Sequence, residues 1–301
     1  MIKTITVINH LGDSLTIDLF NPWGSGLIIE KIEGLGPPKA TIKTTAIATM
    51  DGDLFNSSRA TSRDISIDFQ FLFDPDIETV RQRTYKYFPI KRQVALIVET
   101  DSRTLATYGY VETNVPTIFS ENEGCRISLV CPEAYLYAYG DEGIQSLTFS
   151  SIEPNFEFEF EDPNQESPTL LMGEVALRKE RVFFYDGDAE AGVIILIDAI
   201  GPATNIRIMD TVQRKIMPID TTKLPDGVLK AGDRIIINTN PGEKAVTLLR
   251  AGALTNVLSA LGRNSDWISV SKGDNRFAYT ADTGETNLNI TIESRLLYEG
   301  I

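Results

Sequence analysis

Short segments in which apolar and polar residues alternate recur along the whole chain. Examples are Thr4–Ile8, Ser14–Leu19, Arg63–Phe69 and Asn287–Ile292. Successive side chains of a strand point to opposite faces, so a period of two indicates a strand with one buried face. Turn-forming pairs such as Asp51-Gly52 separate these segments. The sequence therefore predicts a mainly β fold built from many short strands.

One segment has the pattern of a helix, between Pro75 and Phe88. Asp74 is expected to cap its N-terminus, Pro75 suits the first turn, and Pro89 ends it. The residues expected on its buried face are Ile77, Val80, Thr84, Tyr87 and Phe88. We therefore expect one α-helix in the first half of the chain.

A chain of 301 residues with 42% hydrophobic residues can form two domains of ordinary size. The expected boundary lies within 139–143, where a dense apolar strand gives way to small and acidic residues. This predicts an N-terminal domain at 1–140 and a C-terminal domain at 141–301. Residues 144–192 are expected to form an acidic connecting or hairpin segment, which includes the alternating Phe156–Glu161.

The chain is acidic, with 28 Lys and Arg against 42 Asp and Glu and a formal net charge of -14. This charge repels the phosphate backbone, so tight nucleic-acid binding is not expected. No run reaches the roughly 18 apolar residues of a membrane-spanning helix, and the first residues lack the apolar stretch of a signal peptide. Assembly in a cytoplasm is the expectation. Cys125 and Cys131 fit this compartment as free, buried thiols.

Residue types that carry catalysis or bind metals are sparse. His10 is the only histidine and follows the first predicted strand, which favours a surface position over a catalytic one. One histidine and two cysteines are too few for a structural zinc site. The acidic stretches Asp51–Asp53 and Asp186–Glu190 lack the spacing of an EF-hand loop and are interpreted as ordinary turns. We therefore predict a protein with no catalytic site, metal or cofactor.

Several segments together resemble the distal tail protein (Dit) family of long-tailed, siphovirus-type bacteriophages, and the match covers nearly the whole chain. The most distinctive is Ile127–Tyr137. The others are Ile32–Pro37, Asp51-Gly52 followed by Arg63–Ile67, the helix described above, Gly201–Asn205, Ala231–Asp233, Ser265–Trp267, Gly273–Asn275 and Tyr298–Ile301. These segments are mainly turns and strands, so they mark a fold.

The resemblance implies a structural virion protein at the distal end of a phage tail. Its N-terminal domain would be a β-sandwich or split-barrel-like, tail-tube-like domain with one helix, and six copies would form a ring. Its C-terminal domain would be a galectin-like β-sandwich. The implied partners are other copies of the chain, the tail tube protein, the tail-tip or baseplate hub protein and receptor-binding proteins, and DNA would pass through the ring. The family carries no catalytic residues that could be transferred to this chain.

Residues 38–62 are the candidate intersubunit segment. Extended chain with exposed β edges is a liability in a monomer, and a neighbouring subunit in a closed ring can cover it. The residues expected at the interface are Lys39, Thr41, Ile42, Lys43, Ile47, Leu54 and Phe55.

The alternative function is a carbohydrate-binding adhesin of the tail tip, since phage tips contact cell walls. Sugar sites present aromatic faces beside polar groups, and Trp267 and Tyr279 are the candidates for that role. Core packing is the favoured interpretation of Trp267. A wall-degrading hydrolase is a further alternative, which a turbidity assay would reveal.

Overall fold

The computed structural model describes residues 1–48, 51–73, 76–140, 143–154, 173–177 and 180–301, and no side chains of 150–154 or 173–177. The chain divides into two units. Unit 1 comprises Met1–Gly143 together with Leu297–Ile301, and unit 2 comprises Ile144–Leu296. The last five residues thus belong to unit 1, whereas they were expected in the C-terminal domain at 141–301. The expected Phe156–Glu161 strand lies outside the described residues.

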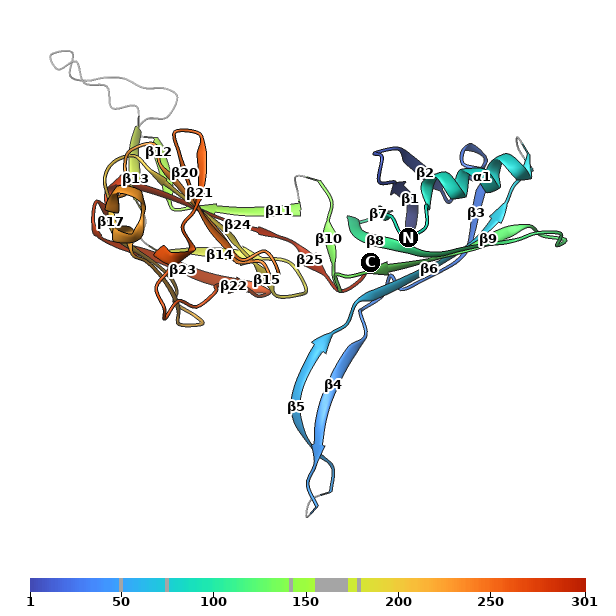
Figure 1. The fold of residues 1–301 in the computed structure, drawn as a ribbon, viewed down its shortest axis with the longest axis horizontal. Coiled ribbons are helices and arrows are strands. Elements are labelled where there is room, and N and C mark those ends of the chain that lie inside the picture. Colours follow the sequence, from blue (N-terminus) through green and yellow to red (C-terminus); the bar gives the residue numbers. More distant parts are fainter. Residues whose placement is uncertain (49–50, 74–75, 141–142, 155–172, 178–179) are drawn as a thin grey trace, which may run out of the picture. The chain divides into compact units, whose positions relative to one another are not determined.

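Unit 1 contains one antiparallel sheet whose main path has the order β2-β1-β7-β8-β9-β6-β3 (Figure 1). Its strands are β1 (Ile2–Ile8), β2 (Ser14–Asp18), β3 (Leu27–Glu33), β6 (Arg63–Phe71), β7 (Gln93–Thr100), β8 (Thr104–Thr117), β9 (Gly124–Cys131), β10 (Leu136–Ala138) and β25 (Leu297–Tyr298). Strand β10 pairs with both β8 and the C-terminal β25. A short 3-10 helix, η1 (Pro22–Gly24), precedes β3. These strands form an open sheet with one α-helix, and β4 (Ala40–Ala46) and β5 (Asp53–Ala60) form a separate two-stranded sheet.

The helix α1 (Ile77–Tyr87) packs against one face of this sheet. Its N-cap is Asp76, whose Oδ1 accepts a hydrogen bond from the Thr79 backbone N–H at 2.8 Å. Hydrogen bonds from Thr79 lower the pKa of the Asp76 carboxyl. The expected cap at Asp74 is therefore wrong by two residues, because Asp76 has the extended backbone that an N-cap requires.

The core of unit 1 lies between the helix and the sheet. Val80 and Phe88 are fully buried there, and the Phe88 ring lies 5.9 Å from that of Phe69 on β6. The expected helix face is thus the buried one, with Ile77 and Tyr87 at its margin. Strand β9 contributes alternate residues that include both cysteines, and both are free and buried as predicted.

A buried arginine joins four separate segments of unit 1. Arg63, at the start of β6, is 3% exposed. Its Nε donates to the Ala134 carbonyl at 3.0 Å, Nη1 to the carbonyls of Gly34 and Gly36 at 2.6 and 2.5 Å, and Nη2 to that of Glu299 at 2.7 Å. Burial lowers the pKa of this guanidinium. The Arg63 anchor, meaning these four hydrogen bonds, holds the C-terminal residues against the β3–β4 connection and the β9–β10 turn.

Unit 2 is a sandwich of a six-stranded and a four-stranded antiparallel sheet (Figure 1). The first has the order β11 (Ile144–Thr148), β24 (Leu288–Arg295), β16 (Ile194–Ala199), β19 (Arg234–Asn238), β20 (Ala245–Arg250) and β21 (Ala253–Asn256). The second has the order β14 (Glu180–Tyr185), β23 (Gly273–Thr283), β17 (Thr204–Asp210) and β18 (Lys215–Ile219). The remaining elements are the pairs β12 (Ser150–Pro154) with β13 (Gly173–Leu177) and β15 (Ala191–Gly192) with β22 (Ser269–Val270), and the 3-10 helices η3 (Thr221–Lys223), η4 (Pro225–Gly227), η5 (Leu258–Ala260) and η6 (Glu285–Asn287).

The two sheets of unit 2 enclose an apolar core. Alternate residues such as Ile195 and Ile237 in one sheet, and Phe277 in the other, are fully buried. The Phe149 and Tyr279 rings meet edge to face with centroids 5.2 Å apart. Over the described residues, a mainly β fold with one α-helix and a C-terminal sandwich is therefore confirmed.

Replacement of the Arg63 guanidinium should loosen unit 1. In the full-length Arg63→Lys variant, a single ammonium cannot reach four carbonyls, and buried acceptors lose their partners. We expect a loss of roughly 2–4 kcal/mol in the local free energy of opening. Hydrogen exchange should become faster in peptides that contain β6, β10 and β25, while unit 2 is unchanged. Arg59→Lys on an exposed strand is the control, and equal protection in the two variants would contradict the anchor.

The thiols should be unreactive in the folded protein. Burial raises the pKa of the Cys125 thiol to about 12 and raises that of Cys131 as well, so almost no thiolate exists near neutral pH. A colorimetric thiol reagent should label neither cysteine in native buffer and both in denaturant. Rapid native labelling at either position would show that this core opens readily.

Candidate intersubunit surface

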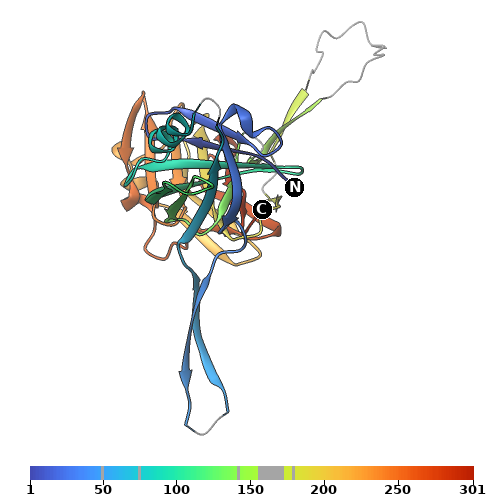
Figure 2. The same ribbon diagram turned by 90° about the vertical axis from the view of Figure 1, so that its right-hand side faces the viewer.

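The candidate intersubunit segment forms a long hairpin of β4 (Ala40–Ala46) and β5 (Asp53–Ala60), paired only with each other. Figures 1 and 2 both show it projecting away from the sheet of unit 1. Every residue of β4 is exposed, as is all of β5 except Ala60. At the base, the Thr61 backbone N–H donates to the Lys39 carbonyl at 2.8 Å and closes the hairpin. Its strands have no described element packed on either face.

The strand register gives this hairpin two different faces. Residues directly opposite each other share a face, and successive residues alternate except at a β-bulge. Ile42 pairs with Ser58, and Thr44 pairs with Phe55. Asn56 is the extra residue of a bulge in β5, so Phe55 and Ser58 lie on the same face. The apolar face consists of Ala40, Ile42, Thr44, Ala46, Asp53, Phe55, Ser58 and Ala60. The basic face consists of Thr41, Lys43, Thr45, Leu54, Ser57 and Arg59.

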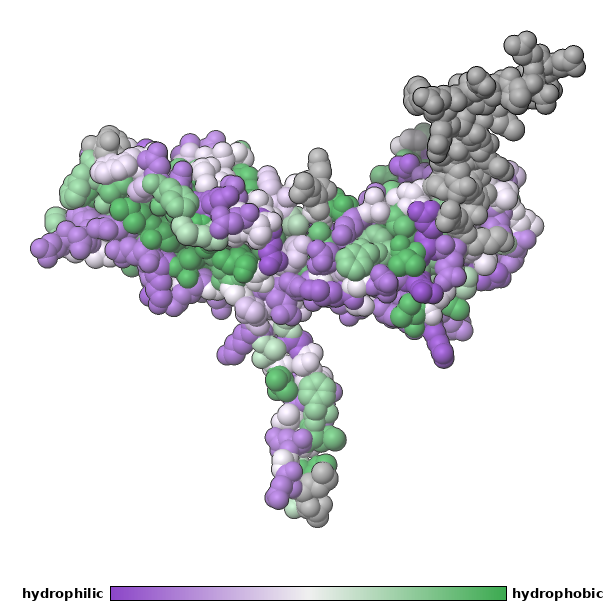
Figure 3. Space-filling model, turned by 180° about the vertical axis from the view of Figure 1, so that it is seen from behind, coloured by the Kyte–Doolittle hydropathy of each residue, from purple (hydrophilic) through white to green (hydrophobic). Residues whose placement is uncertain are grey.

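Large hydrophobic side chains on this hairpin have no cover. Ile42 is 63% exposed, Leu54 56% and Phe55 59%. Figure 3 shows hydrophobic groups beside hydrophilic ones along the hairpin. Ile42 and Phe55 are diagonal neighbours on the apolar face, since Phe55 lies opposite Thr44. An isolated two-stranded hairpin is marginally stable, so these exposed side chains make it a surface suited to burial against a partner.

The other predicted interface residues fall at different places on the hairpin. Lys43 and Thr41 lie on the basic face, and Thr41 pairs with Arg59. Lys39 precedes β4, and Ile47, 38% exposed, follows it. The structure thus brings together all seven predicted residues on one hairpin. Sequence reasoning did not identify Arg59 as a member of the basic face.

Of the two aromatic residues of the sugar-binding alternative, one is buried and the other has a lysine over its ring. Tyr279 is 1% exposed and packs against Phe149 in the core, so its role as a glycan contact is wrong. Trp267 is half-buried, and the Lys244 Nζ lies 5.1 Å from its ring centroid. A sugar could use that ring face only by displacing the ammonium group.

The histidine and the acidic turn considered in the sequence analysis do not form a catalytic or metal-binding cluster among the described residues. His10 is exposed in the turn after β1. Within the Asp186–Glu190 turn, Asp188 pairs with Lys272 at 2.7 Å. No cluster of three or more metal-ligating side chains occurs among the described residues, and no helix described is long and apolar enough to span a membrane.

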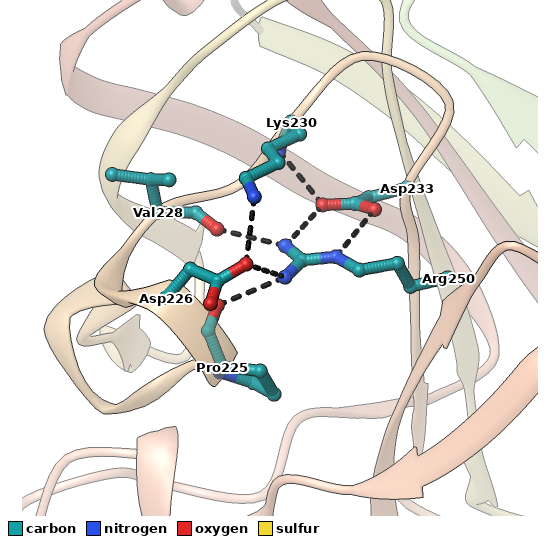
Figure 4. A network of polar contacts seen from close by, with 6 residues as sticks. All are labelled: Pro225, Asp226, Val228, Lys230, Asp233 and Arg250. Carbon is teal, nitrogen blue, oxygen red and sulfur yellow. Dashed lines mark hydrogen bonds and ion pairs between the residues drawn. The ribbon is translucent and has the colours of Figure 1, made fainter.

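A polar network fixes the connection between η4 and β19 in unit 2 (Figure 4). Arg250 of β20 donates from Nε and Nη2 to the two carboxylate oxygens of Asp233 at 2.8 and 2.6 Å. The same guanidinium binds the carbonyls of Pro225 and Val228, and Lys230 Nζ lies 2.6 Å from Asp226 Oδ2. Burial alone would raise the pKa of Asp233, but bonds from Arg250 and the Lys230 backbone N–H lower it overall.

The fold matches those of 13 chains of solved structures. One is the Dit protein of phage SPP1, described as a paradigm of the hub adsorption apparatus in phages that infect Gram-positive bacteria. The alignment covers 97% of this chain and 99% of that one, with a TM-score of 0.63 and 13% identity. The likeness to the Dit family expected from the sequence is therefore confirmed at the level of the fold.

Two structures of the phage P2 baseplate in its activated conformation, with Ca and with Sr, also align. Their TM-scores are 0.48 and 0.45, each at 11% identity, and the alignments cover 100% and 96% of this chain and 100% and 97% of theirs. No protein-family model matches the sequence. No curated protein matches it either.

Loss of the Arg250 guanidinium should destabilise unit 2 in a pH-dependent way. Arg250→Met leaves the Asp233 carboxylate, 4% exposed, without its ionic partner and should cost about 3 kcal/mol near neutral pH. The folded pKa of Asp233 is lowered, so its contribution is present above 3.8, the ordinary value, and is lost as pH falls below it. Unfolding followed through Trp267 fluorescence, with Trp23→Phe in both proteins, should therefore show wild type and variant converging in acid. A difference independent of pH would contradict this account.

Proposed function

We propose that this chain is a structural subunit of a phage tail tip. Six copies form a ring hub at the distal end of the tail, which joins the tail tube to the tail-tip or baseplate protein and lets DNA pass. The observation that carries the proposal is the fold shared with SPP1 Dit over 97% of this chain and 99% of that one. A match over both units supports the same two-part organisation, not a common sheet motif alone.

The exposed hairpin supports a role within an assembly. Its apolar face offers Ile42 and Phe55 to a neighbour, and full burial of such side chains contributes about 1.5–3 kcal/mol each. A closed ring supplies one neighbour for every hairpin, so no copy is left with the surface exposed. The other proposed partners are receptor-binding proteins that attach to the ring.

The acidic composition agrees with a channel for DNA. A net charge of -14 per chain repels duplex DNA, so a ring of such chains lets DNA move without binding it tightly. The chain needs no enzymatic activity for this role. Assembly takes place in the host cytoplasm, and the finished protein is part of the virion.

The apolar face of the hairpin should be required for the ring. The full-length wild type should have the mass of six chains by light scattering and appear as rings in negative-stain microscopy. Ile42→Ser with Phe55→Ser should give monomers with unchanged circular dichroism. The matched control is Val182→Ser with Ile216→Ser, since these side chains of unit 2 are 47% and 42% exposed. A wild-type chain that stays monomeric throughout a concentration series would contradict the proposal.

A further inference from the structure

A second exposed surface of unit 1 has a charge opposite to that of the hairpin. It lies at the connection between β8 and β9, where a shallow hollow of about 320 Å³ opens. Its acidic lining residues are Glu30, Asp68 and Glu123, with Arg126 as the one cation. We call this hollow and the adjoining residues 118–123 the β8–β9 tip surface.

The acidic groups of the β8–β9 tip surface are only partly neutralised. Arg126 of β9 lies 3.5 Å from Asp68 of β6 and 3.8 Å from Glu33 of β3, so one cation is paired with two carboxylates. Glu30 and Glu123 form no ion pair within the part of the chain that the structure describes. Glu30 is the extra residue of a bulge in β3, between Ile29 and Lys31, and it lines the hollow.

This surface also carries exposed hydrophobic groups. Phe119 is 98% exposed and has a φ of 62°, an uncommon conformation for a bulky residue. Ile118 is 47% exposed, and Phe73, 77% exposed, lines a second hollow that shares Asn122 and Glu123 with the first. The surface thus combines apolar and anionic groups.

The basic face of the hairpin has the complementary combination. Lys43 and Arg59 form no ion pair among the described residues, and Leu54 lies between them and the hairpin end. Like charges prevent this face from pairing with the same face of another copy. Opposite charges favour the β8–β9 tip surface of a second copy instead. Two different surfaces in contact form a heterologous interface, the kind that closes into a ring.

We infer that the basic face of the hairpin of one copy docks on the β8–β9 tip surface of the next copy. The occupant of the tip surface is thus a second copy of this chain. This inference rests on the proposed function, because it names the two surfaces that meet in the proposed ring. Lys43 and Arg59 approach Glu30 and Glu123, while Leu54 packs near the tip hydrophobic groups.

Charge reversal on each surface tests the pairing in the full-length protein. Lys43→Glu with Arg59→Glu reverses the hairpin, and Glu30→Lys with Glu123→Lys reverses the tip. Each pair of substitutions places like charges together and should weaken association at least about 100-fold, so each variant alone should be monomeric by light scattering. The matched control, Lys91→Glu with Arg263→Glu, changes two exposed cations elsewhere and should still form rings.

Restoration of assembly separates a lost contact from a folding defect. When the two variants are mixed in equal amounts, every interface in an alternating ring joins opposite charges, so rings should return. The chain with all four substitutions should also form rings by itself. High salt should weaken the wild-type ring and both restored rings.

The outcomes distinguish the inference from the proposed function. If the wild type forms rings and either charge-reversed variant does too, the pairing is wrong while the ring proposal stands. If both variants are monomeric but neither the mixture nor the fourfold variant assembles, the pairing is also wrong. A wild-type chain that never forms rings overturns the proposed function and the pairing together.

Discussion

The Arg63 anchor determines how unit 1 is held together. A guanidinium that is 3% exposed requires hydrogen-bond partners for its donors, and it finds them in carbonyls from the β3–β4 connection, the β9–β10 turn and the C-terminus. The chain leaves unit 1 after Gly143 and returns at Leu297, and this anchor fixes the return. The base of the hairpin starts from the same region, because Gly36 and Lys39 lie in the same connection. A rigid base is what an exposed hairpin needs if it is to present its faces in a constant position.

The hairpin and the sandwich core show two uses of the same strand periodicity. In unit 2, alternate residues of both sheets meet in a shared core, and polar residues lie outside. In β4 and β5, the same alternation separates an apolar from a basic face, but no described residue covers either. A strand pair with two chemically distinct exposed faces is incomplete as a monomer. In the proposed ring, neighbouring copies cover the hairpin, and the β8–β9 tip surface of the next copy covers its basic face.

Sequence patterns located most of these elements but not their contacts. The helix face, the exposed segment 38–62 and the buried cysteines were all predicted. The alternation in Arg63–Phe69 puts Arg63 on the same face as Ile65 and Ile67, so the sequence pattern already indicates a buried charge at this position. Tyr279 was misassigned as a glycan contact for a related reason. Its alternation with Phe277 in β23 places its side chain in the core, as the period of two indicates.

The sequence by itself determined the strand class, the single helix and the acidic character, because these depend on neighbouring residues and on composition. Only the tertiary structure decided which segments meet. The carbonyls that bind Arg63 lie 27, 29, 71 and 236 residues away in the chain. The acidic hollow likewise combines β3, β6 and the β8–β9 connection. Such contacts follow from how the sheet orders its strands, and strand order is set by packing over the whole unit, which no local pattern of residues contains.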